Sequence, residues 1–224
     1  MDAFAKFQSI GAETLISFDD FEKRNNELKA YVFDWDGVFN SGVKSTDGGS
    51  SFSEPDSMGI NMLRFSYFLK HGKLPFTAII TGEINETAQK FARREHFDAL
   101  WMHVKNKGVA LKDLAAQNTF IPAEATFTFD DILDLGAADI SGLRFYVRRK
   151  AAPMLEDYIS ENHLADYITA CDGNSYAVRE VCEFLIALNG NYTETINNRK
   201  AFSEKYAEYL KRRNEVNTQF ETLK

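Results

Sequence analysis

The sequence predicts a doubly wound α/β fold, in which helices cover both faces of a parallel sheet. Short apolar, β-prone segments alternate along the chain with helical segments, and this alternation implies right-handed crossovers between parallel strands. Several of the short segments end abruptly in Asp or Thr, as buried strands do at a functional edge. The 224 residues, 44% of them hydrophobic, are enough for one domain of this kind.

The composition excludes several classes of protein. Charged residues make up 26% of the chain and no run of about 18 apolar residues occurs, so we expect neither disorder nor a membrane partner. The 26 Lys and Arg against 33 Asp and Glu give a net charge of −7, which disfavours a nucleic-acid partner. The acidic N-terminal stretch and the lack of a Cys-x-x-Cys motif indicate a cytoplasmic protein. An anionic substrate therefore requires a local cation.

The first predicted elements lead into a polar loop. We expect an amphipathic helix over residues 12–29 and a buried strand over 31–33. The Gly- and Ser-rich stretch 38–55 predicts a β-hairpin with its turn near Gly48 and Gly49. We call residues 38–55 the flap.

The alternation of strands and helices continues to residue 188. The predicted elements are helix 57–71, strand 76–80, helix 84–96, strand 99–104, helix 107–117, strand 125–129, a short helix after Asp130, strand 143–147, helix 153–160, strand 167–169 and helix 175–188.

The last part of the chain has a different character. Residues 190–224 are polar and helix-prone, with no predicted strand, and their seven Lys and Arg against five Asp and Glu give a charge of about +2. We expect this tail to pack against the core or against a second subunit. The predicted organisation is an N-terminal helical segment 1–29, a main domain 30–189 and a C-terminal helical extension 190–224.

Paired carboxylates follow the first buried strand, in Asp34-Trp35-Asp36-Gly37. Two acids at positions i and i+2, beside a glycine, suit a hard divalent cation. The first acid can also attack a phosphorus atom, and the second can transfer a proton. The alternative is an Asx-type turn without a catalytic role.

A hydroxyl and a lysine follow the next two strands. Thr81 and the backbone N–H of Gly82 can hold a phosphate oxygen, although Thr81 could instead only cap helix 84–96. Lys107 begins a predicted helix, where a cation opposes the helix dipole unless an anion lies nearby. Lys105 is a rival for this role, and a solvated Lys107 is the structural alternative.

A second acidic pair, Asp130-Asp131, follows strand 125–129. Its oxygens can bind a metal ion and the waters around it, whereas the structural alternative is capping of the next helix, the role expected of Asp134. The carboxyl ends of parallel strands meet at one edge of a sheet. We therefore expect the four clusters to form one site.

These motifs, in this order, resemble those of the haloacid dehalogenase superfamily. Within it, the chain is most similar to the 3-deoxy-manno-octulosonate 8-phosphate phosphatase family, over roughly residues 30–188. The resemblance implies a Rossmann-like, HAD-like domain, and the gaps between the motifs are too short to hold a cap domain. The matching residues are Phe33-Asp34-Trp35-Asp36-Gly37-Val38, Asp56-Ser57-Met58-Gly59-Ile60, Ala78-Ile79-Ile80-Thr81-Gly82, Lys107, Asp130-Asp131 and Tyr176-Ala177-Val178-Arg179-Glu180.

The resemblance implies a Mg²⁺-dependent phosphomonoester hydrolase. Asp34 would attack the phosphoryl group to form an aspartyl-phosphate, and Asp36 would protonate the leaving oxygen and then activate water. Magnesium would lie between the Asp34 carboxylate, the Asp36 carbonyl and Asp130, with Asp131 in support. The phosphoryl oxygens would be held by Thr81, Gly82 and Lys107. Capless relatives are typically tetramers whose neighbouring subunit closes the site, so the resemblance implies a homo-oligomer and a small phosphorylated metabolite as substrate.

Departures from the family pattern bear on the substrate. The family's Thr-Gly-Arg is Thr81-Gly82-Glu83 here, and its glycine before the paired acids is Phe129. Related 2-keto-3-deoxynononate 9-phosphate phosphatases resemble this chain in having glutamate at that position. Glu83 could pair with Arg94, and these two residues are the candidates for substrate specificity. An octulosonate 8-phosphate and a nonulosonate 9-phosphate therefore both remain open.

Two other functions compete with the hydrolase. A receiver domain also combines paired acids, a threonine and a lysine, but its acidic pair precedes a single acceptor Asp, whereas here the second acidic cluster comes last. A catalytically lapsed binding or scaffold protein is the other alternative, suggested by Phe129 and the added tail. The intact set of Asp34, Asp36 and Lys107 favours the enzyme.

Overall fold

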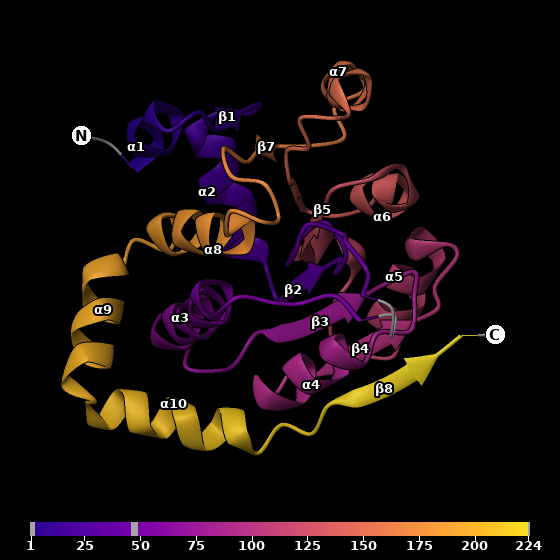
Figure 1. Cartoon of the computed structure of the whole chain (residues 1–224). Helices are drawn as coiled ribbons and strands as arrows, with labels where there is room; N and C mark the ends of the chain where they lie inside the picture. The colour runs from indigo at the N-terminus through magenta and orange to yellow at the C-terminus, as the bar shows by residue number, and fades with distance from the viewer. Residues whose placement is uncertain (1–2, 46–48, 224) are drawn as a thin grey trace.

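An eight-stranded sheet forms the centre of the computed structural model in Figure 1, which describes residues 3–45 and 49–223. The strands lie in the order β1-β7-β6-β5-β2-β3-β4-β8, and every neighbouring pair is parallel except β1 with β7. The strands are β1 Glu13–Thr14, β2 Ala30–Phe33, β3 Phe76–Ile80, β4 Ala99–Met102, β5 Ala125–Phe129, β6 Leu143–Tyr146, β7 Tyr167–Ile168 and β8 Gln219–Thr222.

Helices cover both faces of this sheet, so the predicted doubly wound α/β fold is confirmed. The α-helices are α1 Ala3–Ser9, α2 Phe18–Glu27, α3 Glu54–His71, α4 Glu86–Arg94, α5 Lys107–Ala116, α6 Leu135–Ala138, α7 Pro153–Glu161, α8 Ala177–Leu188, α9 Tyr192–Ala201 and α10 Glu204–Asn214. Two short 3₁₀ helices, η1 Pro122–Glu124 and η2 Ile132–Asp134, complete the described elements.

Two apolar cores lie on opposite faces of the sheet. One lies under α3, α4 and α8, and the other under α5, α6 and α7. Strand β2 is buried along its whole length, with Tyr31 and Phe33 in the first core and Ala30 and Val32 in the second. Because successive side chains of a strand point to opposite faces, such an unbroken apolar run is what a central parallel strand requires.

The N-terminal part differs from its prediction. The expected helix over 12–29 begins only at Phe18, because the hydroxyl of Ser17 accepts the backbone N–H of Asp20 and caps α2 there. The residues before it form the short strand β1, which pairs with β7. The prediction of a helix was therefore wrong for residues 12–17, the first six of the predicted range.

The flap contains no β-strand among its described residues 38–45 and 49–55, so paired hairpin strands were a wrong prediction there. A backbone hydrogen bond from Ser45 N to Gly49 O, at 2.9 Å, joins its two sides. The predicted turn residue Gly48 lies outside the described residues. Near the base of the flap, the side chain of Asn40 accepts the backbone N–H of Gly42 at 2.8 Å and so takes the place of a strand partner.

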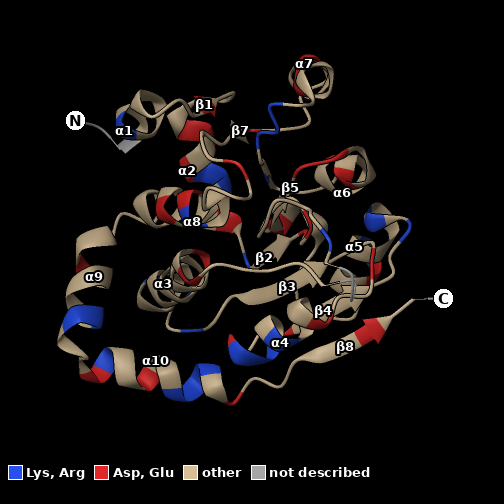
Figure 2. Cartoon of the chain, in the orientation of Figure 1, with Lys and Arg blue, Asp and Glu red and all other residues tan. Residues whose placement is uncertain are grey.

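The C-terminal tail is helical over α9 and α10, in agreement with the predicted helical extension, but its end is a strand. Figure 2 shows basic residues along α9 and α10, and Figure 1 shows β8 beside β4 at the edge of the sheet. Its backbone is bound by Gln219 N to Asp98 O at 2.9 Å and by Leu223 N to Met102 O at 3.1 Å. The expectation of a strand-free tail was therefore wrong.

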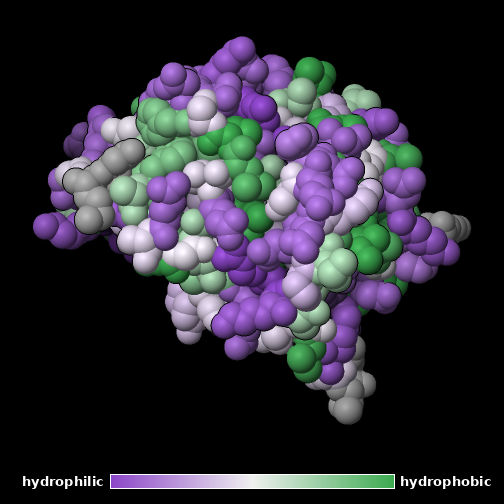
Figure 3. Space-filling view, turned by 90° about the horizontal axis from the view of Figure 1, so that it is seen from above, coloured by the Kyte–Doolittle hydropathy of each residue, from purple (hydrophilic) through white to green (hydrophobic). Residues whose placement is uncertain are grey.

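None of the helices among the described residues combines the length and the apolar character needed to cross a membrane. Figure 3 shows one face of the molecule, where apolar residues form separate patches on a mostly hydrophilic surface. Small scattered apolar patches are ordinary for a protein surface.

We predict that a chain ending at Glu215 is less stable than the full chain by about 1–3 kcal/mol, because the edge of β4 loses its backbone partners. Removal of β8 also deletes Phe220, so the Arg93 guanidinium loses the aromatic ring whose centre lies 4.6 Å from it. Urea unfolding measures the difference. The exposed substitution Glu221→Gln is the control, and an unchanged midpoint for the shortened chain would contradict the role of β8.

Candidate active site

The carboxyl ends of four adjacent strands bring the predicted residues to one edge of the sheet. Asp34 follows β2, Thr81 follows β3 and Asp130 follows β5, whereas Lys107 begins α5 after β4. The backbone ties these ends together, since Asp34 N donates to Thr128 O and Thr81 N donates to Trp101 O, both at 2.9 Å. The four clusters therefore meet, as the parallel sheet predicts.

A cavity of about 420 Å³ opens at this edge. It is lined by Asp34, Asp36, Lys44, Thr81, Gly82, Glu83, His103, Val104, Lys105, Lys107, Asp130, Asp131, Leu133 and Asp134. Its size suits a small metabolite. Acidic and basic side chains face the same space, so the cavity can hold both a cation and an anion.

Lys107 is the buried cation of the site. Its ammonium donates to Asp34 Oδ1 and to Asp134 Oδ1, both at 2.5 Å, and its side chain is only 4% exposed. Burial lowers the pKa of Lys107, but the two carboxylates outweigh this effect and raise it, so the lysine is charged. Its rival Lys105 lies exposed on the cavity wall. The N-cap of α5 is Asn106.

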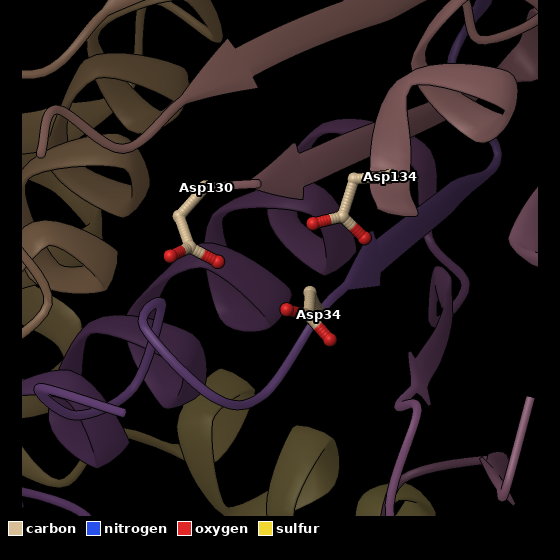
Figure 4. A group of neighbouring side chains, drawn as sticks. All are labelled: Asp34, Asp130 and Asp134. Carbon is tan, nitrogen blue, oxygen red and sulfur yellow. The ribbon is translucent and has the colours of Figure 1, made fainter. Parts of the chain in front are cut away.

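Three buried carboxylates face one another beside this lysine, and Figure 4 shows them converging from β2, β5 and η2. One oxygen from each of Asp34, Asp130 and Asp134 lies within 4.8 Å of the others. Burial and the nearby charge of Asp134 raise the pKa of Asp34 well above its usual range, against the effect of Lys107. Lys107 and the half-exposed Arg149 leave these three acids with an excess of negative charge, which a hard divalent cation would neutralise.

Asp130 has the form expected of a metal ligand. Its Oδ1 is buried without a hydrogen-bond partner, while its Oδ2 pairs with the Arg149 guanidinium. Burial raises the pKa of Asp130 to about 6, although Arg149 opposes this rise. An orphaned oxygen beside two other carboxylates fits a divalent cation such as Mg²⁺. The neighbouring Asp131 is exposed and accepts the N–H of Ile132 at 2.7 Å.

Gly37 permits the close approach of these groups. It has a φ of 89°, and a Cβ at this position would collide with Asp130 and with the guanidinium of Arg149. Only glycine combines this backbone conformation with so little space. Gly37, which follows the first acidic pair, is therefore required so that Asp130 of the second acidic pair can lie close to it.

Thr81 forms another part of the cavity wall. Its hydroxyl is buried and has no hydrogen-bond partner, which fits a group that binds a ligand oxygen. The helix that follows is capped instead by Asn85, whose Oδ1 accepts Thr87 N at 2.9 Å and Ala88 N at 3.1 Å. The capping alternative for Thr81 is therefore wrong, and its hydroxyl is available beside Gly82 in the cavity wall.

Asp36 lies at the flap side of the cavity. Its Oδ1 accepts the hydroxyl of Ser50 at 2.6 Å, and its Oδ2 accepts the ammonium of Lys44 at 2.5 Å. Both partners belong to the flap. The side chain of Asp36 also lines the cavity, but it is not one of the three converging carboxylates.

Two predictions about single residues need correction. Arg94 does not pair with Glu83: its guanidinium contacts Glu54 at 2.6 Å and Glu95 at 2.8 Å, and it stacks over Phe52. It lies outside the described lining of the cavity, whereas the exposed Glu83 is part of it. Asp134, expected only to cap a helix, also binds Lys107.

The sequence reasoning missed several lining or supporting residues. Lys44, Arg149 and His103 carry no motif signal, because the flap, the end of β6 and the tail bring them into place. His103 Nδ1 lies 3.0 Å from the carbonyl of Leu223, so the tail reaches the cavity wall. The spacing of Asp134 could have predicted its place in the site, because side chains four residues apart lie on the same side of a helical turn and Asp134 comes four residues after Asp130.

We predict that Gly37→Ala weakens divalent metal binding by about tenfold or more, because its methyl group displaces Asp130 and Arg149. Titration of Mn²⁺ by electron paramagnetic resonance measures this affinity. Gly42→Ala is the matched control: its φ is also positive, at 76°, but the nearest atom to its Cβ is Arg149 Nη2 at 3.6 Å. Equal losses in both variants would show backbone strain alone and contradict the prediction.

Known proteins resemble the chain over most of its length, although no family model matches it. It is 27% identical over 183 residues to the 3-deoxy-D-manno-octulosonate 8-phosphate phosphatase KdsC of Escherichia coli K12, which covers 80% of this chain and 89% of the relative. The structure of the phosphatase of the same name from Yersinia pestis has a TM-score of 0.64 at 26% identity, over 77% of this chain and 88% of that one.

A third comparison concerns the fold. The phosphatase of Moraxella catarrhalis, solved with a magnesium ion, a phosphate ion and KDO, matches 81% of this chain and 99% of its own, with a TM-score of 0.68 at 22% identity. The motifs, the capless doubly wound sheet and these similarities agree. The chain is therefore similar, in sequence and in fold, to 3-deoxy-D-manno-octulosonate 8-phosphate phosphatases.

Proposed function

We propose that this protein is a Mg²⁺-dependent phosphomonoester hydrolase that acts through an aspartyl-phosphate on Asp34. The observation that carries the proposal is the convergence of three carboxylates, a buried lysine and an unpartnered threonine hydroxyl in one cavity. A phosphoryl group needs positive charge around its oxygens and a nucleophile in line with the leaving group. This cavity contains residues for both tasks.

Asp34 is the proposed nucleophile. One of its carboxylate oxygens forms a bond to phosphorus, and the bond from phosphorus to the leaving oxygen breaks. Asp36 gives its proton to that oxygen and then takes a proton from the water that attacks the aspartyl-phosphate. The products are the alcohol and inorganic phosphate, and Asp34 is free again.

Positive charge and N–H or O–H donors hold the phosphoryl oxygens. Asp34, Asp130 and the backbone carbonyl of Asp36, with Asp131 in support, would hold Mg²⁺, which would supply positive charge to the phosphoryl group. Lys107 donates to another oxygen from its place between Asp34 and Asp134. The Thr81 hydroxyl and the Gly82 N–H complete the proposed phosphate site.

We propose a small phosphorylated sugar acid as the substrate class. The relatives named above act on an octulosonate 8-phosphate, and two exposed or half-exposed lysines of this cavity, Lys44 and Lys105, can attract a carboxylate. Glu83 contributes the opposite charge to the same wall. The octulosonate 8-phosphate and the nonulosonate 9-phosphate therefore both remain candidates. Arg94, whose guanidinium binds Glu54 and Glu95, is not proposed as a determinant.

We further propose that residues 30–189 form the catalytic part of a cytoplasmic homo-oligomer, a tetramer by resemblance. The described residues form no cap over the cavity, and the family that the chain resembles typically closes a capless site with a neighbouring subunit. Sedimentation of the full chain tests it. A monomer at micromolar concentration would exclude the tetramer without affecting the proposed chemistry.

We predict that Asp34→Asn lowers the hydrolysis of p-nitrophenyl phosphate by about three orders of magnitude, because an amide cannot form the acyl-phosphate. The assay contains Mg²⁺ and follows nitrophenolate. Asp139→Asn, an exposed acid after α6, is the matched control and should keep the parental rate. Equal rates in the parent and in Asp34→Asn would remove Asp34 from the mechanism.

We predict that EDTA abolishes the activity and that added Mg²⁺ restores it, because three buried acids then lose and regain their neutralising cation.

In the restored enzyme, kcat/KM should be higher for phosphorylated octulosonates and nonulosonates than for glucose 6-phosphate. The neutral sugar phosphate is the control for the carboxylate. Higher efficiency on the neutral sugar would contradict the sugar-acid proposal and leave the hydrolase intact.

A further inference from the structure

The hydroxyl of Ser50 lies at the meeting point of three hydrogen bonds behind Asp36. Trp35 Nε1 lies 3.1 Å from it, Asn85 Nδ2 lies 2.7 Å from it, and Asp36 Oδ1 lies 2.6 Å from it. Ser50 is 3% exposed and is not among the described residues that line the cavity. Its contact with the site therefore runs through Asp36.

The direction of each of these bonds is determined by its partners. The indole Nε1 of Trp35 can only donate. Asn85 Oδ1 already accepts two backbone N–H groups at the start of α4, so the nitrogen of its amide must face Ser50 and donate. Both bonds therefore end on Ser50 Oγ, and the single hydrogen of this hydroxyl is left for Asp36 Oδ1.

The groups that orient Ser50 are held in place. Trp35 and Asn85 are completely buried, and the indole stacks on Phe39 with ring centres 4.8 Å apart. Asn85 is also the N-cap of α4. A hydroxyl between two such donors has little freedom, so its bond fixes Asp36 Oδ1 against the core.

The second oxygen of Asp36 has a more exposed partner. The ammonium of Lys44 pairs with Oδ2, and the Lys44 side chain is 35% exposed and lines the cavity. Ion pairs of exposed, flexible side chains are weak, whereas a buried hydrogen bond with fixed geometry is retained. Lys44 can leave Oδ2 for an anionic group of the substrate, and Ser50 has no comparable alternative.

We propose that Ser50 is a positioning residue that holds Asp36 Oδ1 and so makes Oδ2 the oxygen that exchanges protons with the substrate and water. The inference rests on the proposed hydrolase and assigns a function to the flap, which supplies both Ser50 and Lys44. Proton transfer depends on placing the acid within hydrogen-bond reach of the leaving oxygen.

Two substrates with different leaving groups can show whether the position of the Asp36 carboxyl group matters for catalysis. A sugar hydroxyl is a poor leaving group and needs a proton as its bond to phosphorus breaks, whereas p-nitrophenolate leaves as an anion. Since kcat/KM reports the steps up to this bond cleavage, loss of acid positioning should affect the sugar phosphate more than p-nitrophenyl phosphate. A general loss of structure would affect both substrates alike.

The test compares Ser50→Ala with the parent on p-nitrophenyl phosphate and on 3-deoxy-manno-octulosonate 8-phosphate, with glycerol 3-phosphate as a second alkyl phosphate. We expect kcat/KM to fall by about 10- to 100-fold on the alkyl phosphate that the parent uses and by less than about threefold on p-nitrophenyl phosphate. Ser51→Ala, an exposed neighbour, is the matched control and should change neither.

A second variant changes the hydrogen bond from Ser50 to Asp36 without removing the Ser50 hydroxyl. Asn85→Asp keeps an oxygen to cap α4, but it replaces the donor to Ser50 by an acceptor that competes with Asp36 for the hydroxyl hydrogen. It should show the same selective loss on the alkyl phosphate. This variant provides the answer if Ser50→Ala does not fold.

The outcomes separate the inference from the proposed function. Equal falls on both substrates, or no fall on either, in the folded variants would overturn the role of Ser50 while leaving the hydrolase in place. A parent protein that hydrolyses none of these phosphates with Mg²⁺ would instead overturn the proposed function. Selective loss in Ser50→Ala and Asn85→Asp supports the inference.

Discussion

The site depends on one interaction, the pairing of the buried Lys107 ammonium with the carboxylates of Asp34 and Asp134. Charged groups lose their hydration on burial and are stable only when they are paired at close range. This pairing requires α5 and the turn after β5 to approach closely. Gly108 meets that requirement, since a Cβ there would lie 2.6 Å from the carbonyl oxygen of Gly136.

The pairing of Lys107 with Asp34 and Asp134 leaves the site with more negative than positive charge. Asp34, Asp130 and Asp134 bring three carboxylates to a space in which Lys107 is the buried cation, with the half-exposed Arg149 at its edge. The excess of negative charge favours a divalent cation, and the cation in turn makes a phosphate dianion acceptable. Metal binding and phosphate binding are therefore two consequences of one electrostatic arrangement.

Much of this arrangement could be predicted from the sequence, because strand ends carry local signals. The motifs around Asp34, Thr81 and Asp130 each follow a short apolar run, and parallel strands bring such ends together. The choice between Lys105 and Lys107 depended on burial, which the sequence does not display. The expected cap by Asp134 is confirmed, since its Oδ2 accepts the N–H of Asp131, but its Oδ1 also binds Lys107, a long-range contact with no local signal.

Long-range contacts explain the other errors. Strand β8 forms because the edge of β4 offers it backbone partners, and nothing within Gln219–Thr222 predicts that edge. Arg94 was paired with Glu83, but α4 begins only at Glu86 and carries Arg94 about 12 Å along the helix axis, to Glu54. The flap is organised by Asn40 and Ser50 rather than by strand pairing.

Crystals soaked in Mn²⁺ and measured at a wavelength where manganese scatters anomalously would test the central claim most directly. The account predicts one strong anomalous peak among the carboxylates of Asp34 and Asp130, on the side of the cavity that faces Thr81. No peak there at saturating Mn²⁺, or a peak only at another acidic cluster, would contradict it.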